Sequence, residues 1–442
     1  MSHLRAKSLY LSLAAELGTS ERAETNSSFD IVNKRFSECI DGLECFMTEE
    51  RRKIVDAEVS ATALATTNDR ATMQTLESIS ATLSRFEALA NSIRVKRELQ
   101  HIKHETGPAD VEMMKPLHFL QPSALLSRKT TLITTYCEGN GCPMEKVLVE
   151  WSPLDRRWSS SDVQLARTRM SHLAKQLSIQ DKPVSLRILQ TIGVVEDFRY
   201  DTSKRFGIVY RLPKNCDVSN RPISLNTLFL EESTETTLPD PFLGERFDLA
   251  RALATAVYEL HASGWFHKEI NSHNIVFFAS SDKDTTAIGD PYIIGFGYAR
   301  PDTSDAVSLV RSLGDHALYR HPDLRKADQD TGGQHVSRFR RKYDIYSLGL
   351  VLLEIGIWDP ITVFNEDSLD PQGFTNRLLR VCKRDLGRHM GRIYRNVVIR
   401  CIEGLDEAED DIDLSEEELR KSDELMNFYW SVLSELSKCH CK

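Results

Sequence analysis

Apolar positions in residues 1–106 repeat with the period of an α-helix. This stretch has no proline and only two glycines, Gly18 and Gly42. Its large apolar side chains recur at steps of three, four and seven residues, which places them along one side of a helix. The two series are Val32, Phe36, Cys39, Leu43 and Phe46, and then Met73, Leu76, Leu83, Phe86 and Ile93. We therefore predict that residues 1–108 form a helical bundle or a helical hairpin.

The pattern changes after Gly107-Pro108, and we interpret residues 109–128 as a linker. Two short runs rich in β-branched and apolar residues then follow, Thr130–Tyr136 and Val147–Trp151. The turn residues Gly139-Asn140-Gly141 lie between them. This arrangement predicts two strands joined as a β-hairpin.

Helical and extended patterns alternate from here to residue 262. The sequence predicts a helix at Val163–Leu177, strands at Leu186–Val195 and Phe206–Leu212, and a long helix at Arg246–Ala262. Pro213 ends the last of these strands. We expect an α+β fold, with a small β-rich part over residues 129–213 and a larger helical part over residues 214–442.

Composition limits the class of protein. The 442 residues carry 41% hydrophobic and 27% charged residues, which is typical of a globular protein. Lys+Arg 56 against Asp+Glu 65 gives a net charge of −9, so nucleic acid is not an expected partner. The nine cysteines lack the spacing of a disulfide framework, and no apolar segment is long enough to span a membrane. These features predict a cytoplasmic protein without a transmembrane segment.

Several motifs stand in a fixed order in the helical part. Residues 267–274 read His-Lys-Glu-Ile-Asn-Ser-His-Asn, and Gly295-Phe296-Gly297 follows them. His321-Pro322-Asp323 comes next, and then Tyr343-Asp344-Ile345-Tyr346-Ser347-Leu348-Gly349. In this order the motifs resemble the HRDLxxxN, DFG, APE and DVWSxG segments of protein kinases. Residues 129–442 resemble a divergent, kinase-like family found in fungi, which implies a two-lobed kinase fold.

The resemblance assigns roles to particular residues, and it implies that the chemistry is degenerate. Glu269 stands where a kinase has its catalytic Asp, and Gly295 replaces the Asp that holds Mg²⁺. Asn274 matches the second metal ligand, although it equally fits a side chain that ties the loop backbone together. The positions that hold a kinase together are kept: His267, Phe296 and Gly297 at the two loops, and Asp344 and Gly349 on the central helix. Asp344 matches a buried Asp that accepts hydrogen bonds from the catalytic-loop backbone.

The nucleotide-anchoring groups of a kinase are also replaced. If Val147-Leu148-Val149 is the strand that carries the lysine, then Glu150 occupies the lysine position and would repel phosphate. The helix 163–177 offers no glutamate partner, and Gly139-Asn140-Gly141 has the spacing of a hairpin turn rather than of a phosphate-binding loop. We expect no metal site and no cofactor, with ATP and Mg²⁺ bound weakly or not at all.

Two functions follow from these replacements. The first is a pseudokinase, a kinase fold that acts as a signalling or regulatory module without phosphotransfer. The alternative is an unorthodox, active Ser/Thr protein kinase that uses Glu269 and Asn274. The order of domains resembles proteins in which a helical domain of the HeLo or prion-inhibition-and-propagation type precedes such a module. That resemblance implies a role in incompatibility or cell-death signalling. The N-terminal helices are then expected to bind a protein partner or to self-associate, and peripheral membrane contact stays open.

Charge is unevenly distributed in the last hundred residues. A basic cluster, Arg338-Phe339-Arg340-Arg341-Lys342, precedes an acidic run from Asp406 to Glu418. The cluster is either a solvated loop or a docking site for an acidic partner, such as this run. Ser415 and Glu418 form a capping box before a predicted C-terminal helix. Its apolar stripe comprises Leu419, Met426, Tyr429, Leu433 and Leu436.

Overall fold

A computed structural model describes most of the chain after residue 111. The described residues are 112–126, 130–139, 143–154, 159–179, 182–199, 204–214, 216–217, 221–230, 241–279, 289–301, 314–330, 339–366, 370–405, 424–425 and 427–440. All of them belong to one compact unit, Asn91–Lys442. The helices predicted for residues 1–108 lie outside the described residues.

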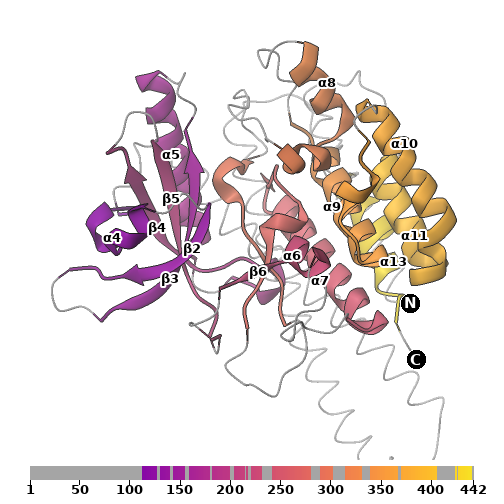
Figure 1. Cartoon of the computed structure of the whole chain (residues 1–442), viewed down its shortest axis with the longest axis horizontal. Coiled ribbons are helices and arrows are strands. Elements are labelled where there is room, and N and C mark those ends of the chain that lie inside the picture. Colours follow the sequence, from indigo (N-terminus) through magenta and orange to yellow (C-terminus); the bar gives the residue numbers. More distant parts are fainter. Residues whose placement is uncertain are drawn as a thin grey trace, which may run out of the picture. The chain divides into compact units, whose positions relative to one another are not determined.

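A five-stranded sheet forms the first part of this unit (Figure 1). Its strands are β1 Met114–Lys115, β2 Thr131–Tyr136, β3 Glu145–Pro153, β4 Thr191–Asp197 and β5 Arg205–Arg211, in the order β1-β4-β5-β3-β2. Only the β1–β4 pair is parallel among these neighbours. Strands β2 and β3 pair in register from Tyr136 with Glu145, so the segment containing Gly139 joins two antiparallel neighbours, as predicted.

The two faces of the sheet bury different sets of side chains, because residues along a strand alternate in direction. On strand β3, Val147, Val149 and Trp151 pack with Leu120 on one face. Leu148 instead packs with helix α5, Ser160–Leu177, on the other face. The start of α5 is fixed by a capping box, in which Ser159 and Asp162 each accept a backbone N–H of the other. Glu150 has the same direction as Leu148, so it faces away from the Val147 layer.

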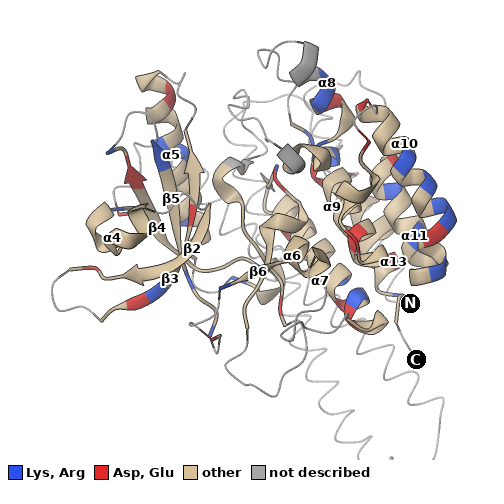
Figure 2. Cartoon of the chain, in the orientation of Figure 1, with Lys and Arg blue, Asp and Glu red and all other residues tan. Residues whose placement is uncertain are grey.

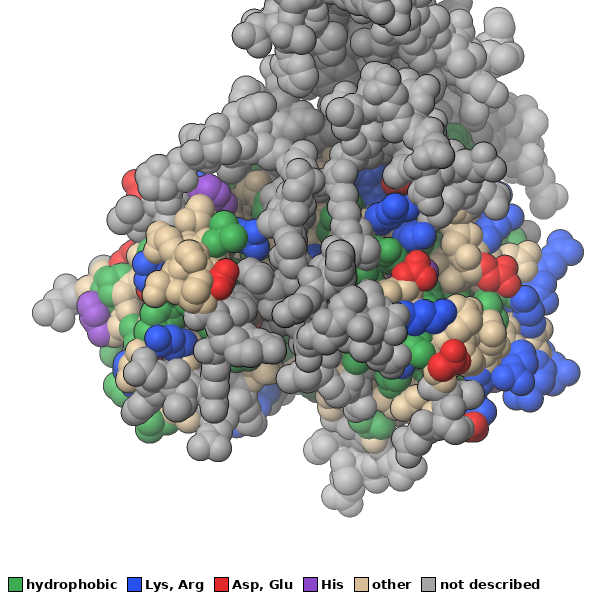
Figure 3. Space-filling model, turned by 90° about the horizontal axis from the view of Figure 1, so that it is seen from above, with side chains coloured by type: hydrophobic (Ala, Val, Ile, Leu, Met, Phe, Trp, Pro, Cys, Tyr) green, Lys and Arg blue, Asp and Glu red, His purple; other side chains and the backbone are tan. Residues whose placement is uncertain are grey.

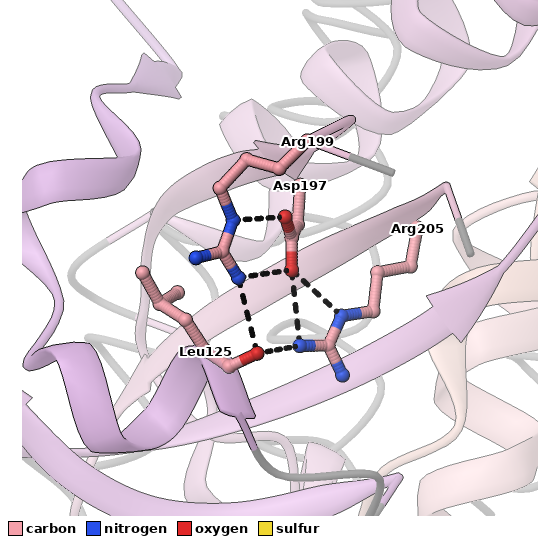
Figure 4. Close-up of polar contacts among 4 residues, drawn as sticks. All are labelled: Leu125, Asp197, Arg199 and Arg205. Carbon is pink, nitrogen blue, oxygen red and sulfur yellow. Dashed lines mark hydrogen bonds and ion pairs between the residues drawn. The ribbon is translucent and has the colours of Figure 1, made fainter. Parts of the chain in front are cut away.

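Residues 109–128, predicted as a linker, contain strand β1 and helix α4, Pro122–Leu126. A cluster of charged groups fastens the end of α4 to the sheet (Figure 4). Arg199 and Arg205 both donate to the carbonyl oxygen of Leu125, at 3.1 and 2.9 Å, and both also donate to the carboxylate of Asp197. Burial alone would raise the pKa of Asp197, but the two guanidinium groups hold it below its ordinary value.

Helices form the rest of the unit (Figure 1). The longer ones are α7 Leu243–Ala262, α8 Pro322–Asp330, α9 Arg341–Ile357, α10 Pro371–Val381 and α11 Gly387–Glu403. Shorter elements are α6 Leu225–Leu230, α13 Ser434–Leu436, and the π-helical turns η7 Cys382–Leu386 and η8 Tyr429–Leu433. Helix α9 is buried along almost its whole length, which explains its nearly continuous apolar sequence. A Cβ at Gly349 would lie 2.7 Å from the Cβ of Cys401, so this glycine allows α9 and α11 to approach closely.

Short strands and turns connect the helices and hold the loops discussed below. Among them are η2 Val184–Leu186, β6 Ile223–Ser224, β7 Trp265–Phe266, η3 Ser272–Asn274, β8 Ile275–Phe277, β9 Tyr292–Ile293, η4 Phe296–Tyr298 and β10 Arg300–Pro301. Strand β8 lies between β6 and β9, and β7 pairs with β10. The remaining turns are η1 Leu117–Phe119, η5 Gly314–Tyr319 and η6 Ile361–Phe364. No described helix is long and apolar enough to cross a membrane.

The predicted elements agree with the structure in type, and two predictions are wrong in detail. The strand predicted at Leu186–Val195 begins only at Thr191, because residues 184–186 form a 3-10 turn. In the C-terminal helix, Leu436 is buried as predicted and Leu433 is partly buried against the core, but Phe428 and Val432, which lie outside the predicted stripe, are the other fully buried side chains. The π-helical turn at 429–433 changes the residues per turn there, which rotates the buried face. The predicted capping box at Ser415 lies outside the described residues.

Together these elements make a fold of mixed α and β structure, with one small sheet followed by a helical part. A single apolar cluster runs from Leu148 and Met170 on the sheet side to Leu353 and Val398 in the helices. Ser185 donates to the carboxyl group of Glu259 on α7 at 2.8 Å, which adds a polar contact between the same two parts. Burial raises the pKa of Glu259 to about 7, so this carboxyl is partly protonated at neutral pH.

Candidate functional site

The loop at residues 267–274 is held by one buried carboxylate on helix α9. Asp344 accepts hydrogen bonds from the backbone N–H groups of His267 and Lys268, both at 2.8 Å. The carboxylate oxygen that accepts the His267 N–H also lies 3.1 Å from Nε2 of His261. Lys268 has a φ of 74°, which is unusual for a residue with a side chain. The predicted contact of Asp344 with this loop is thus present, and it offsets the strain at Lys268.

His267 connects the loop at 267–274 to the segment before Gly295. Its Nε2–H donates to the carbonyl oxygen of Ile294 at 3.0 Å, and its Nδ1 accepts the backbone N–H of Glu269 at 3.2 Å. Burial lowers the pKa of His267 to about 4, so the ring is neutral at pH 7. The ring also meets Phe296 edge to face, with centroids 4.6 Å apart. His267 is therefore a structural link between the two loops.

Asn274 is occupied within its own loop. Its side-chain amide donates to the carbonyl oxygen of Glu269 at 2.8 Å, and its backbone N–H donates to Oδ1 of Asn271 at 3.0 Å. The side chain of Asn271 also donates to the Glu269 carbonyl, at 3.0 Å. Of the two interpretations of Asn274, the contacts match the side chain that ties the loop backbone together. Glu269 itself is partly buried.

Glu150 reaches the other loop from strand β3. Its carboxyl group is almost fully buried, with 6% of the residue exposed, and it accepts the backbone N–H of Gly295 at 2.9 Å. The N–H of Gly297 lies at 3.4 Å, and the hydroxyl of Tyr210 donates at 3.1 Å. Glu150 therefore accepts hydrogen bonds from both glycines of Gly295-Phe296-Gly297, which we call the glycine segment.

The two glycines of this segment are required by its conformation and by its neighbours. Gly295 has a φ of 92°, in the left-handed region that favours glycine, and a Cβ there would lie 2.3 Å from Nδ2 of Asn274. A Cβ at Gly297 would lie 2.1 Å from Oγ of Ser152 on strand β3. An aspartate at position 295 would therefore displace Asn274, and Gly297 lets the loop backbone approach the strand.

Two opposing effects act on the carboxyl group of Glu150. Burial raises its pKa, because removal from water disfavours the ionised form. The backbone N–H groups of the glycine segment and the hydroxyl of Tyr210 act in the opposite direction and only partly offset this effect. The same contact, together with burial, keeps the pKa of Tyr210 well above its ordinary value. The carboxyl group of Glu150 thus takes its hydrogen-bond donors from Tyr210 and the glycine segment.

A second polar network beneath the loop at 267–274 was missed by the sequence analysis. The hydroxyl of Tyr319 donates to the carboxyl group of Glu354 at 2.6 Å and lies 2.7 Å from Oγ of Ser272. The backbone N–H of Ile361 donates to the same carboxyl oxygen at 2.9 Å. Burial raises the pKa of Glu354 to about 8. The near-continuous apolar run of α9 contains this single acidic residue, and that is the signal that would have identified it.

The structure brings most of the predicted residues together. Asp344 accepts the N–H of His267, whose ring bonds to Ile294, and Ile294 in turn donates to the carbonyl of Asn274 at 2.9 Å. Gly295 follows Ile294 and donates to Glu150 on the sheet. Gly349 lies apart from these groups and packs against α11. Within the described residues no group of three or more His, Cys, Asp or Glu side chains is placed to hold a metal ion.

No protein-family model matches this chain, and no curated protein matches it either. The resemblance to kinases therefore rests on the sequence motifs.

Proposed function

We propose that this chain is a pseudokinase, a kinase-like module that signals through binding rather than through phosphotransfer. The order of elements supports this proposal, with strands β2 and β3, helix α5, strands β4 and β5 and then a helical part. The anchoring of the loop at 267–274 by Asp344 supports it too. Fold alone does not define function, so the argument depends on the site.

One observation carries the proposal, the hydrogen bonds from Gly295 and Gly297 to Glu150. In a kinase, a lysine on this strand and an aspartate in this loop both act on the phosphates of ATP, the second through Mg²⁺. Here the strand supplies a carboxyl group and the loop supplies backbone N–H groups, which satisfy each other. A phosphate placed here would meet the Glu150 carboxyl and would have to break these contacts.

The surviving polar residues do not restore a catalytic arrangement. The amide nitrogen of Asn274 donates to the carbonyl of Glu269 and holds the loop. Its amide oxygen is the atom that a metal would bind, but Gly295 supplies no carboxylate as a second ligand. Phosphoryl transfer requires a positioned metal and a positioned hydroxyl acceptor within a fraction of an ångström. The alternative, an active Ser/Thr kinase that uses Glu269 and Asn274, has no contact of the described residues in its favour.

The test is a thermal-shift measurement of the full chain with and without millimolar Mg-ATP. A ligand at about 100 times its Kd stabilises a protein by about 2.7 kcal/mol, which is easily detected. We expect no shift for the natural chain and none for the double variant Glu150→Lys with Gly295→Asp, because an aspartate at 295 collides with Asn274. A clear shift for the natural chain, or autophosphorylation that is lost in Glu269→Ala, would contradict the proposal.

We extend the proposal to the N-terminal region. Its helical periodicity and its place before the kinase-like part support a cytoplasmic signalling protein, in which residues 1–108 bind a protein partner or self-associate. The resemblance to fungal incompatibility and cell-death proteins supports the pathway. We expect Leu43→Asp or Phe86→Asp in the full chain to abolish this association. Sedimentation and partner capture that are unchanged in both variants would refute this part.

A further inference from the structure

A strongly basic surface lies on the helices at the far end of the molecule from the sheet (Figure 2). It is formed by α10, η7 and α11, residues 371–403, which we call the basic hairpin. This segment has eight Lys and Arg residues and two Asp and Glu residues, a formal charge of +6 in a chain of net charge −9. In the space-filling view, Lys and Arg side chains gather along the same edge (Figure 3).

Both arms of the hairpin contribute to one surface. The chain bends sharply at Gly391, where φ is 79° and ψ is 169°, so the part of α11 after this residue runs back along η7. The ammonium group of Lys383 pairs with Glu403 at 2.8 Å across the arms. Nearer the bend, a Cβ at Gly387 would lie 3.2 Å from Cδ of Arg395. The basic side chains of the two arms are therefore neighbours.

The apolar and basic residues of the hairpin occupy opposite sides. Its large apolar side chains are buried in the core, and they are Phe374, Leu378, Leu386, Met390, Tyr394 and Val397. Arg380, Arg384 and Arg388 follow one another at steps of four residues, and all three are exposed. Residues four apart on a helix lie on the same side, about 6 Å apart along the axis. This row of arginines thus faces solvent.

Three of the eight basic residues pair with carboxylates. Arg377 pairs with Glu366, Arg384 with its neighbour Asp385, and Lys383 with Glu403. Among the described residues, Arg380, Arg388, Arg392 and Arg400 form no ion pair with a carboxylate. A row of like charges repels itself, and an anionic ligand would relieve that repulsion.

The chemistry of the surface selects an acidic polypeptide over other anions. No large hydrophobic residue of the hairpin is exposed, so it lacks groups that would insert into a membrane or stack on bases. Outside residues 371–418 the chain has a formal charge of −6. A membrane or a nucleic-acid duplex would face this negative remainder, whereas a short acidic segment would cover only the hairpin. Arginine also suits carboxylates, because its planar guanidinium group can donate two parallel hydrogen bonds to one carboxylate.

We propose that the basic hairpin binds the acidic run of the same chain, residues 406–418. Nine of its thirteen residues are Asp or Glu and none is Lys or Arg, a formal charge of −9. The run begins three residues after α11 ends at Glu403, beside the Lys383 end of the surface. Thirteen residues reach up to about 45 Å when extended, which is far more than the length of the row of arginines. Covalent attachment so close to the surface gives the run a high effective concentration.

The basic cluster at residues 338–342 is a poorer partner for this run. Arg341 is buried and lies 3.9 Å from Glu424, while Lys342 lies 3.9 Å from Asp323. These two members of the cluster already have carboxylate partners. The structure thus moves the expected docking site of the acidic run from the cluster to the basic hairpin, where more cations are exposed.

The experiment uses the full chain and a fluorescent peptide of residues 406–418. In a neutralised variant, every Asp and Glu of the run is changed to Asn or Gln, which would free the hairpin. We expect the peptide to bind this variant at least about tenfold more tightly than the natural chain, whose site is occupied. Adding Arg384→Ala, Arg388→Ala and Arg392→Ala should weaken binding by about tenfold, because it removes three of the cations that would pair with the run.

The controls separate this proposal from its alternatives. Lys146→Ala with Arg221→Ala removes two exposed cations elsewhere and should leave peptide binding unchanged. Equal binding to the natural and neutralised chains, no binding to either, or binding that is insensitive to the three arginines would overturn the proposal. So would sedimentation showing that the natural chain associates through the run, since a second copy would then be the occupant. None of these outcomes depends on whether the chain binds ATP.

Discussion

Two buried carboxyl groups, Asp344 and Glu150, have the same kind of partner and different consequences. Each accepts backbone N–H groups from a loop that is distant in the sequence. Asp344 lies on the central helix α9 and holds the loop at 267–274 in a conformation that includes the positive φ of Lys268. Glu150 lies on a strand of the sheet and takes up the N–H groups of the glycine segment. The hydrogen bonds of Asp344 support the conformation of the loop at 267–274, whereas those of Glu150 use the N–H groups of the glycine segment.

On the proposed function, contacts that hold the loops persist after the residues for phosphate chemistry have been replaced. Contacts that shape the loops are internal to the protein and stabilise it with or without a ligand. On the proposed function, residues that act only on phosphate add nothing to the stability of the protein without ligand, whereas Glu150 and the glycine segment form hydrogen bonds there. Four experiments test this comparison, from the largest expected effect to the smallest.

Asp344→Ala should cause the largest loss of stability. It would leave the backbone N–H groups of His267 and Lys268 and a ring nitrogen of His261 without their buried acceptor, at a cost of about 3 kcal/mol or more. Chemical denaturation of the full chain measures the loss. Asp248→Ala removes an exposed aspartate from helix α7 and should change stability by less than about 0.5 kcal/mol. If the two variants lost similar amounts of stability, the contact of Asp344 with the loop would not stabilise the fold.

Glu150→Leu should cost about 2 kcal/mol, since it leaves the Tyr210 hydroxyl and the Gly295 N–H buried and without an acceptor. Glu150→Gln keeps a side-chain oxygen as an acceptor and should cost less. Glu145→Leu on the same strand serves as the matched control, because that residue is partly exposed and pairs with Arg211 at the surface. If Glu150→Leu were as stable as Glu145→Leu, the contact with the glycine segment would have no energetic weight.

The pH dependence of stability should distinguish Glu150 as a group whose pKa is raised by burial. For a carboxyl group with a raised pKa in the folded state, the full stability is present below the unfolded pKa of about 4.5 and is lost as pH rises through the folded value. The contribution of Glu150 to the free energy of unfolding should therefore decrease as pH rises above about 4.5. Comparing the natural chain with Glu150→Gln separates this contribution from that of groups such as His267, whose lowered pKa acts in the opposite direction.

Glu150→Gln and Glu354→Gln each remove one of the groups that cause this slope. Glu354 contributes in the same direction up to its pKa of about 8. The free energy of unfolding of the natural chain, taken relative to that of each variant, should decrease as pH rises, and the decrease should be larger relative to the double variant. A difference that is independent of pH, or one that increases with pH, would contradict the assignment.

Asn274→Ala should have the smallest effect, a loss of about 1 kcal/mol from the hydrogen bond to the Glu269 carbonyl. The same variant should leave the response to Mg²⁺ unchanged, because the side chain holds the loop rather than a metal. Thermal melting with and without millimolar Mg²⁺ checks both statements. A Mg²⁺-dependent stabilisation that disappears in Asn274→Ala would restore this residue as a ligand.

The sequence determined the elements of this fold wherever periodicity and local signals coincide. Helices α5, α7 and α9 and strands β2, β3 and β5 have apolar patterns that match their buried faces. The contact of Asp344 with the loop was predictable because the motifs fix both partners. The strand β1 and the helix α4 were not, because a strand of two residues and a helix of five carry too little pattern.

Only the tertiary structure decided how the replaced residues are used. The sequence shows Glu150 and Gly295 separately, and their distance along the chain hides the hydrogen bond between them. The donor is a backbone N–H, which every residue except proline has, so the residue type does not predict it. The direction of the acceptor side chain depends on the pleat of β3. The basic hairpin also depends on the tertiary structure, since the basic residues of its two arms lie close together only because the chain turns back at Gly391. Local pattern specifies elements, whereas contacts between distant backbone and side-chain groups depend on how those elements pack.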